Sequence, residues 1–417
     1  MPSLQTQLEK LKKASYQLQL SSTSQRNKAL KNIKTTLLNN IPSILRANKK
    51  DLAKMDDANP LRDRLLLTEE RIHSICREID TIIKLPDPLN RVLEEYTPPS
   101  KIHLKKVSVP LGCVGVIYES RPNVTIDVTA LCLKSGNTIL LRGGSDAYES
   151  NKILTKLIHE ALEKSDIPKE SVQLLKPDRE LVTAMMKANQ YLDLIIPRGS
   201  MSLIQIVREQ STVPTIETGA SVVHTFVDES ADLDMACTIV HNEKTRRPSV
   251  CNAVDTVLVH QKIAATFLKK LAQKMSRSDT ILHCDKKAYE LLKTHYPKEN
   301  LTADADQQYD REFLSLQMNI HLVKSIDEAI AHIRQYSLKH SESIVTKNKK
   351  NADQFLHEVD AACVYVNTST AFSDGAQFGL GAEIGISTQK LHARGPMGLR
   401  ELTSYKWLVS SKGNIRT

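Results

Sequence analysis

Three segments decide the fold and follow one another closely: Val114-Gly-Val-Ile-Tyr118, the apolar segment Val124 to Leu133, and Thr138-Ile-Leu-Leu-Arg142. The two short runs are almost wholly apolar, which is typical of strands buried on both faces of a parallel sheet. The segment between them has the length of a helix and is followed by Gly136, a residue that favours helix ends. We therefore predict a strand, a crossover helix and a second, parallel strand.

The same alternation continues downstream. We expect further strands at Val172–Leu175, Leu192–Ile196 and Val213–Ile216, and helices from the Gly143-Gly-Ser145 turn to about Lys164, at Leu181–Lys187 and at Met201–Glu209. Five β runs alternating with four helices predict an α/β fold with a parallel, doubly wound sheet. Right-handed crossovers place helices on both faces of such a sheet.

The flanking segments have other periodicities. Leucine and isoleucine at helical spacing predict helices over about 3–20, 25–46 and 60–85, and His103 to Val109 alternates as a strand of a ribbon does. After Asp228 a second α/β unit is expected, and a last strand near the C-terminus carries Trp407, the only tryptophan. The elements expected in the second unit are a helix at 232–241, strands at 319–323, 343–346 and 361–367, and a helix at 326–334.

Composition limits the classes of function. The chain has 417 residues and a formal net charge of +9, but its lysines and arginines are dispersed and lack interleaved aromatic residues, so we expect no nucleic-acid binding. No stretch approaches the roughly 20 apolar residues that span a bilayer, and we expect no membrane association. The seven cysteines have no repeated close spacing and therefore favour neither disulfides nor a zinc site, so we predict a cytoplasmic protein. The thirteen histidines show no ligand spacing either, so we predict no bound metal.

Polar turns follow several predicted strands. Such turns meet at the carboxyl edge of a parallel sheet, where α/β proteins bind ligands. Asn123 follows the first strand and either caps the next helix, which is the default interpretation, or donates its amide to an oxyanion. Arg142-Gly-Gly-Ser145 and Pro197-Arg-Gly-Ser200 follow two others and suit phosphate groups. No G-x-G-x-x-G motif follows any strand, so a bound nucleotide would be held differently.

One cysteine stands apart. Cys251 ends the basic, proline-containing stretch Lys244-Thr-Arg-Arg-Pro-Ser-Val-Cys-Asn252. A thiol reacts as the thiolate, and nearby cations favour that form. The alternative is a buried cysteine that only packs, and for Cys113, Cys132, Cys237 and Cys363, which lie in predicted core elements, that alternative is favoured.

In combination these motifs resemble those of the gamma-glutamyl phosphate reductases, a branch of the aldehyde dehydrogenase superfamily. The resemblance covers nearly the whole chain and is carried by Tyr118-Glu-Ser-Arg-Pro-Asn-Val124, Gly136-Asn-Thr-Ile-Leu-Leu-Arg-Gly-Gly144, Ile196-Pro-Arg-Gly-Ser200, Arg247-Pro-Ser-Val-Cys-Asn252 and Ala393-Arg-Gly-Pro-Met-Gly-Leu399. It implies reduction of L-glutamyl 5-phosphate to L-glutamate 5-semialdehyde with NADPH, through a cysteine thioester, in proline biosynthesis. It also implies a homo-oligomer and a functional association with glutamate 5-kinase.

The resemblance further implies an aldehyde dehydrogenase-like fold with three parts. A Rossmann-like cofactor domain is expected at 1–227, with the ribbon 101–112 belonging to an oligomerisation arm. An α/β catalytic domain is expected at 228–362. Residues 363–417 would return to the cofactor domain and end in an oligomerisation tail.

Residue roles follow from the same resemblance. Cys251 matches the nucleophile and Asn123 the oxyanion amide. The expected cofactor contacts are Arg142, Gly143, Ser145, Gly199, Ser200 and Glu312, and the candidates for substrate binding are Lys244, Arg247 and Arg394. Glu217 lies where hydrolytic relatives keep a base, and an acyl-phosphate reductase has no use for one.

Two departures from the family pattern stand near the site. Glu243 and Arg246 replace the alanine and glutamine more often found there, and Ala220-Ser-Val-Val-His224 lacks a cysteine before the histidine. Two other functions stay open, namely oxidation of a free aldehyde and a non-catalytic binding protein of this fold.

Overall fold

The computed structural model describes residues 3–56, 59 and 62–416, and the chain divides into two compact units. Unit 1 contains Met1–Thr218, Gly379–Gly385 and Leu391–Thr417, and unit 2 contains Gly219–Phe378 and Ile386–Lys390. The predicted boundary at 227 is therefore too late, because strand β7 (His224–Val227) pairs with strands of unit 2. The predicted boundary at 362 is too early, since β13 (Cys363–Val366) pairs in the same sheet.

The beginning of unit 1 is helical, as the spacing predicts, but its described residues form five helices where three are expected. They are α1 (Leu4–Gln19), α2 (Thr23–Leu38), α3 (Ile41–Leu52), α4 (Arg62–Leu65) and α5 (Glu69–Lys84). The single helix expected over 25–46 is interrupted at Asn39 and Asn40, and Pro42 stands in the first turn of α3, a position that tolerates proline. The helix expected over 60–85 is likewise divided before Thr68, which caps α5.

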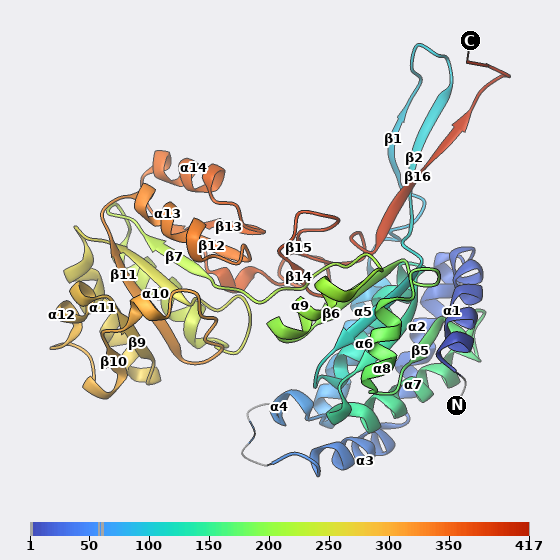
Figure 1. Ribbon diagram of the computed structural model, residues 1–417, viewed down its shortest axis with the longest axis horizontal. Helices are drawn as coiled ribbons and strands as arrows, with labels where there is room; N and C mark the ends of the chain where they lie inside the picture. The colour runs from blue at the N-terminus through green and yellow to red at the C-terminus, as the bar shows by residue number, and fades with distance from the viewer. Residues whose placement is uncertain (1–2, 57–58, 60–61, 417) are drawn as a thin grey trace. The chain divides into compact units, whose positions relative to one another are not determined.

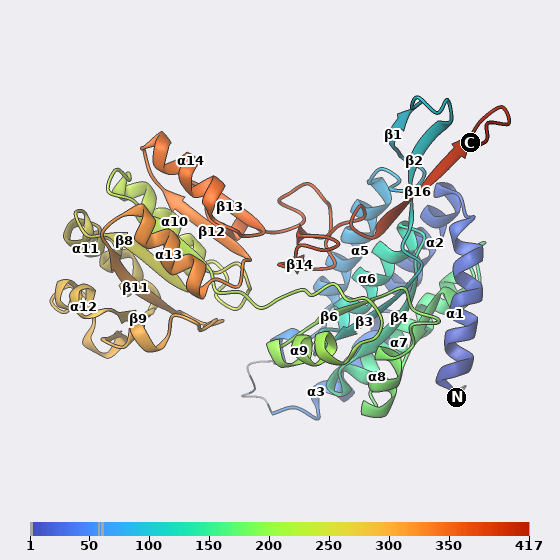
Figure 2. The ribbon, with the colours of Figure 1, turned by 45° about the horizontal axis from the view of Figure 1, so that its top comes forward.

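The central sheet of unit 1 is parallel, with the strand order β5-β4-β3-β6, and Figure 2 labels β4, β3 and β6 of this sheet. Its strands are β3 (Cys113–Tyr118), β4 (Thr138–Gly143), β5 (Val172–Leu174) and β6 (Leu194–Arg198), and its crossover helices are α6 (Pro122–Lys134), α7 (Tyr148–Leu162), α8 (Arg179–Met186) and α9 (Met201–Gln210). The fifth strand expected at 213–216 is wrong. Only isolated bridges at Thr215 and Thr218 join this segment to the sheet, and Pro214 has no N–H to donate to a ladder.

Helices cover both faces of this sheet, as predicted. Val114, Val116 and Tyr118 point into the core shared with α2, α5, α6 and α7, whereas Cys113 and Ile117 pack on the side of α1, α8 and α9. This alternation along β3 is the period of two that strands impose.

A three-stranded antiparallel arm also belongs to unit 1 (Figure 1). It contains β1 (Val92–Tyr96), β2 (His103–Pro110) and β16 (Thr403–Ser410), in the order β1-β2-β16. The predicted ribbon strand and the predicted C-terminal strand are therefore both confirmed, and they pair with each other.

Unit 2 is built on a seven-stranded parallel sheet with the order β10-β9-β11-β8-β7-β12-β13. Besides β7 and β13, its strands are β8 (Thr256–His260), β9 (Ile281–Cys284), β10 (Leu301–Thr302), β11 (Gln317–Val323) and β12 (Ser341–Val345). Its helices are α10 (Leu233–Thr245), α11 (Ala264–Met275), α12 (Lys286–Leu292), α13 (Ile326–Tyr336) and α14 (Lys349–Glu358). Two further short strands are β14 (Ile386–Ser387), in unit 2, and β15 (Gly395–Pro396), in unit 1.

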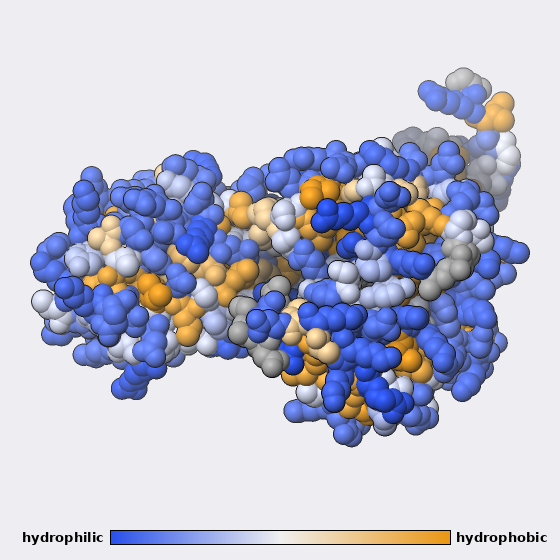
Figure 3. Space-filling view, turned by 60° about the horizontal axis from the view of Figure 1, so that its bottom comes forward, coloured by the Kyte–Doolittle hydropathy of each residue, from blue (hydrophilic) through white to orange (hydrophobic). Residues whose placement is uncertain are grey.

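The visible surface is mostly hydrophilic, with apolar residues in scattered groups (Figure 3). None of the helices that the structure describes combines the length and the apolarity that crossing a bilayer requires.

Gly136 ends the first crossover helix, α6, with a left-handed backbone. It follows α6 with φ +73°, and the backbone N–H groups of Gly136 and Asn137 donate to the carbonyls of Leu133 and Cys132, which is the Schellman pattern. A Cβ on Gly136 would lie 2.9 Å from Leu89 Cδ1 and 3.0 Å from Pro110 Cγ.

We predict that Gly136→Ala lowers the free energy of unfolding of unit 1 by about 2 to 3 kcal/mol, through the left-handed backbone and the displaced neighbours. Gly379→Ala is the matched control, because Gly379 has the same φ of +73° and nothing within 4 Å of its Cβ position. Urea unfolding should show a loss of about 1 kcal/mol for the control. Equal losses in the two variants would contradict the packing argument.

Candidate active site

The site residues predicted from the sequence are distributed over both units. Unit 1 carries Asn123, Arg142, Gly143, Ser145, Gly199, Ser200 and Arg394, and unit 2 carries Lys244, Arg247, Cys251 and Glu312. In unit 1 the turns after β3, β4 and β6 share one edge, because these three strands are adjacent and parallel. Arg394 is half-buried in the C-terminal segment just before β15.

The turn after β6 already holds an anion, and that anion is the protein's own Glu119. Ser200 caps α9, its backbone N–H donates to Glu119 Oε2 at 3.0 Å, and its Oγ donates to Glu119 Oε1 at 2.9 Å. A Cβ on Gly199 would lie 2.6 Å from Glu119 Cδ. The carboxylate therefore occupies the helix N-terminus at which the sequence predicts phosphate binding.

The end of β4 and the turn after it carry Arg142, Gly143 and Ser145. Gly143 has no room for a side chain, because its Cβ would lie 2.1 Å from Asn151 Nδ2. Arg142 is half-buried, burial lowers its pKa, and its Nε has no hydrogen-bond partner among the described residues. Ser145 is exposed at the start of a short 3₁₀ turn. A buried N–H without a partner suits an anionic ligand.

Asn123 does not cap α6, so that default interpretation is wrong. The N-cap position belongs to Arg121, and Pro122 starts the helix. The Asn123 amide instead donates to Asp127 Oδ2 at 2.9 Å, one turn further along the helix. Burial raises the pKa of Asp127 to about 7, and nearby Glu78 adds to that effect. The amide is thereby oriented, and it has a second N–H to offer.

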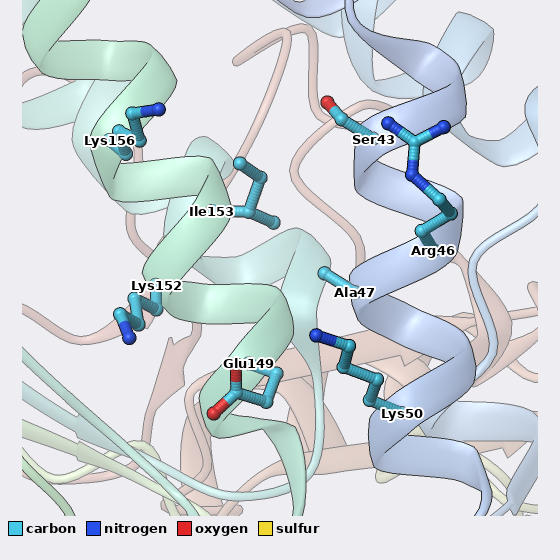
Figure 4. Close-up of a pocket in the computed structure, with 8 residues that line it drawn as sticks. All are labelled: Ser43, Arg46, Ala47, Lys50, Glu149, Lys152, Ile153 and Lys156. Carbon is cyan, nitrogen blue, oxygen red and sulfur yellow. The ribbon is translucent and has the colours of Figure 1, made fainter.

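A basic groove of about 300 Å³ lies between α3 and α7, outside the predicted site (Figure 4). Four cationic side chains and one carboxylate line it: Arg46, Lys50, Lys152, Lys156 and Glu149. The helices are joined at the beginning of α7, where the backbone N–H of Ser150 donates to Asp51 Oδ2 at 2.7 Å. None of the site residues predicted from the sequence lines this groove.

The cysteines of the two units differ in exposure. All seven lie in the described part of the chain, and six are buried, whereas Cys251 is half-exposed. The predicted packing role of Cys113, Cys132, Cys237 and Cys363 is consistent with their burial. Cys251 lies in the irregular segment between α10 and β8, where a nucleophile can be reached.

Hydrogen bonds from distant segments hold the Cys251 segment. The hydroxyl of Ser221 donates to the Cys251 carbonyl, and Thr370 Oγ1 donates to the Asn252 carbonyl at 2.8 Å. The Asn252 amide in turn donates to the Ser373 carbonyl at 3.0 Å. Two consecutive carbonyls therefore accept from side chains, as an irregular buried backbone requires.

Glu243 supports the same segment through Thr370. Its Oε1 accepts the Thr370 backbone N–H at 2.9 Å, and its Oε2 accepts the Thr225 hydroxyl at 2.9 Å. Burial raises the pKa of Glu243 to about 7. One of the two departures from the family pattern thus reaches the nucleophile's segment through one intervening residue.

Lys244 is not placed to bind substrate, which corrects that prediction. Its side chain is fully buried, with Nζ 3.9 Å from Asp255 Oδ1 and 3.4 Å from the Ser315 carbonyl. Burial lowers its pKa, while Asp255, Glu243 and Glu312 oppose that effect. The ammonium compensates buried carboxylates inside unit 2. Arg247, by contrast, is exposed four positions before Cys251.

Glu312 meets the Cys251 segment through Ser221. Its Oε1 lies 3.3 Å from the Ser221 backbone nitrogen and 3.1 Å from the Ser221 hydroxyl. Ser221 and Thr370 were missed by the sequence analysis, because neither belongs to a recognisable motif. For Ser221, the only signal was its place in a segment that departs from the family pattern.

Comparisons with known proteins agree on one family. The model of the aldehyde dehydrogenase family matches residues 8–287. The chain is 50% identical to the gamma-glutamyl phosphate reductase of Chlorobium phaeobacteroides (98% of each chain covered) and 49% identical to that of Bacteroides thetaiotaomicron (97% of this chain, 96% of the relative). A crystal structure of the Thermotoga maritima gamma-glutamyl phosphate reductase superposes with a TM-score of 0.95, at 44% identity and with all of each chain covered.

The buried Glu243 carboxyl predicts a pH dependence of stability. Its pKa is about 7 in the folded chain and 4.5 ordinarily, so the folded state is relatively most stable below pH 4.5 and loses stability as the pH rises through 7. The loss is on the order of 3 kcal/mol. Glu243→Gln removes this loss, so its free energy of unfolding relative to the wild type should rise between pH 5 and pH 8.

Urea unfolding at both pH values checks this expectation. Glu209→Gln on the exposed surface of α9 is the control and should leave the pH dependence unchanged. A Glu243→Gln variant whose difference from the wild type is the same at both pH values would show that folding does not raise the pKa of Glu243.

Proposed function

Because the chain belongs to the aldehyde dehydrogenase family and, within it, to the gamma-glutamyl phosphate reductases, we propose that it reduces L-glutamyl 5-phosphate to L-glutamate 5-semialdehyde and phosphate. NADPH is the proposed reductant and proline biosynthesis the proposed pathway. The observation that carries this proposal is Cys251. It is the half-exposed cysteine among seven, and it lies on a segment held by side chains from elsewhere in unit 2.

The first step is nucleophilic attack by the Cys251 thiolate on the acyl carbon. The new S–C bond forms as the C–O bond to phosphate breaks, and phosphate departs with the electron pair. The product is a thioester on Cys251. Phosphate is a good leaving group, so this step needs no acid on the protein. Exposed Arg247 and half-buried Arg394 are the proposed partners of the substrate's anionic groups.

An oxyanion develops during this attack. We assign its stabilisation to the Asn123 amide and the Cys251 backbone N–H. The Asn123 amide donates one N–H to Asp127, which leaves its second N–H for the oxyanion. A preorganised donor of this kind contributes roughly 3 to 4 kcal/mol to the transition state.

The turns of unit 1 fit a dinucleotide phosphate ester. Gly143 and Gly199 present backbone without side chains, and the buried Nε of Arg142 has no partner among the described residues. Arg142, Gly143 and Ser145 are the proposed contacts at the adenosine end, Gly199 and Ser200 at the pyrophosphate, and Glu312 at the nicotinamide ribose. Glu119 must leave Ser200 if the pyrophosphate takes that helix N-terminus. When bound, NADPH supplies the hydride that reduces the thioester carbonyl.

Cys251 is regenerated in the last step. The reduced adduct is a thiohemiacetal, and it collapses to the aldehyde as the S–C bond breaks and the sulfur leaves as thiolate. The protein's part in this step is to hold the sulfur and the oxyanion in place.

We also propose an oligomeric state, a compartment and a partner enzyme for this protein. Val92, Leu93, Tyr96, Tyr405, Leu408 and Val409 are exposed on the edge strands β1 and β16, which supports a homo-oligomer formed through the arm. The seven free thiols support a reducing compartment, for which we propose the cytoplasm. An acyl phosphate is a reactive substrate, so we propose a functional association with glutamate 5-kinase, which produces it.

The reverse reaction tests the proposed function. With phosphate present, the wild-type chain should reduce NADP⁺ with L-glutamate 5-semialdehyde over many turnovers, and without phosphate it should form no more than one NADPH per Cys251; the absorbance of NADPH follows the reaction. Cys251→Ala should lower the rate by at least about a thousandfold, since it removes the nucleophile. Cys237→Ala removes a buried thiol of the same unit and should retain the rate. Activity that survives in Cys251→Ala, or a wild type that reduces neither NADP⁺ nor NAD⁺, contradicts the proposal.

Substitution of Glu217 distinguishes this reaction from the oxidation of a free aldehyde with water. The latter needs a base to activate water, whereas Glu217 lies 3.6 Å from Arg208 Nη1 in unit 1. We predict that Glu217→Gln keeps phosphate-dependent turnover within about threefold of the wild type, because no water attacks in that reaction. If turnover is lost while NADP⁺ still binds, the hydrolytic reaction is favoured.

A further inference from the structure

Ser221 lies between two residues of the proposed site, Cys251 and Glu312. Its side chain is fully buried, and all of its contacts described below lie within unit 2. The hydroxyl contacts the Cys251 carbonyl on one side and Glu312 Oε1, at 3.1 Å, on the other. The backbone nitrogen of Ser221 lies 3.3 Å from the same carboxylate oxygen.

These two contacts compete for one hydrogen. A serine hydroxyl has a single O–H to donate, and both the carbonyl and the carboxylate oxygen are acceptors. Water does not reach the buried hydroxyl, so these two oxygens share its hydrogen. A carboxylate attracts the hydrogen more strongly than a neutral carbonyl does, unless its charge is already engaged by other donors.

Glu312 lies near a buried cation. The buried ammonium of Lys244 interacts electrostatically with Glu312, with Asp255 and with Glu243. The backbone N–H of Phe313, the next residue, donates to Asp255 Oδ1 at 3.1 Å, which fixes the chain at this point. The Glu312 carboxylate is thus an anchored acceptor, with Ser221 on one side.

We propose that Ser221 is a positioning residue that couples cofactor binding at Glu312 to the orientation of the Cys251 peptide. This inference rests on the proposed function, in which Glu312 binds the ribose of the cofactor. When ribose hydroxyls donate to Glu312, the carboxylate competes less well for the Ser221 hydrogen. That hydrogen is then committed to the Cys251 carbonyl, and the peptide that follows the nucleophile becomes fixed.

The reactivity of Cys251 is the direct readout of this coupling. We measure the rate of Cys251 alkylation by iodoacetamide at pH 7, with and without saturating NADPH, by mass spectrometry of the Cys251 peptide. In the wild type, NADPH should change the rate by at least about fivefold, the lower end of typical coupling between sites. In Ser221→Ala the two rates should agree within about twofold, because the linking hydroxyl is gone.

Three further measurements complete the design. Ser135→Ala is the matched control, because Ser135 is also fully buried and donates to a backbone carbonyl, at Leu131, but belongs to unit 1. It should keep the wild-type response. Glu312→Asp moves the carboxylate away from Ser221 by one methylene group and should weaken the response of the alkylation rate to NADPH. This second variant tests the coupling in case Ser221→Ala does not fold. Fluorescence titration with NADPH should show that Ser221→Ala binds the cofactor within about threefold of the wild type, as expected for a residue that acts through another.

The outcomes separate the two proposals. A wild type that does not bind NADPH contradicts the proposed function and the coupling together. A wild type that binds NADPH without any change in the alkylation rate contradicts the coupling alone. A folded Ser221→Ala variant, or Glu312→Asp, that keeps the full wild-type response also overturns the coupling, and it leaves the proposed function intact.

Discussion

A buried backbone carbonyl on an irregular segment needs a donor, and this constraint shapes the nucleophile's surroundings. Strands satisfy their carbonyls through their neighbours, but the segment that carries Cys251 lies between α10 and β8 and has no ladder. Side chains take over that role, with Ser221 at the Cys251 carbonyl and Thr370 at the Asn252 carbonyl. Leaving either carbonyl unsatisfied would cost roughly 1 to 3 kcal/mol. The cysteine is therefore held in place by residues that perform no chemistry themselves.

The same requirement explains the buried charges of unit 2. Thr370 is fixed by Glu243, and the neighbouring Lys244 lies among the carboxylates of Asp255, Glu243 and Glu312. Buried charges are tolerated only when they are paired and hydrogen-bonded. The sequence has a basic stretch before the nucleophile. In the structure, Lys244 of this stretch belongs to a buried network of charges, whereas Arg246 and Arg247 are exposed.

Local patterns predicted most of the elements and few of the supporting contacts. The apolar runs at β3 and β4 and the glycine after α6 are visible in the sequence, because burial on both faces and a left-handed helix end leave clear signals. The run at 213–216 looked like a strand, although Pro214 removes a donor that a strand needs. The burial of Lys244 could not be predicted, since its carboxylate partner Asp255 gives no sign of proximity. Thr370 lies 118 positions from Asn252, and no local rule links them.

The proposed reaction passes through a covalent intermediate at Cys251, and this species can be observed directly. Incubation of the wild-type chain with L-glutamate 5-semialdehyde and NADP⁺, without phosphate, allows oxidation to the thioester but withholds the group that releases it. Mass spectrometry of the acid-quenched and digested protein should then find the glutamyl group on the peptide that contains Cys251, formed together with NADPH. NADPH formation without an adduct, or an adduct on a different residue, would contradict the account.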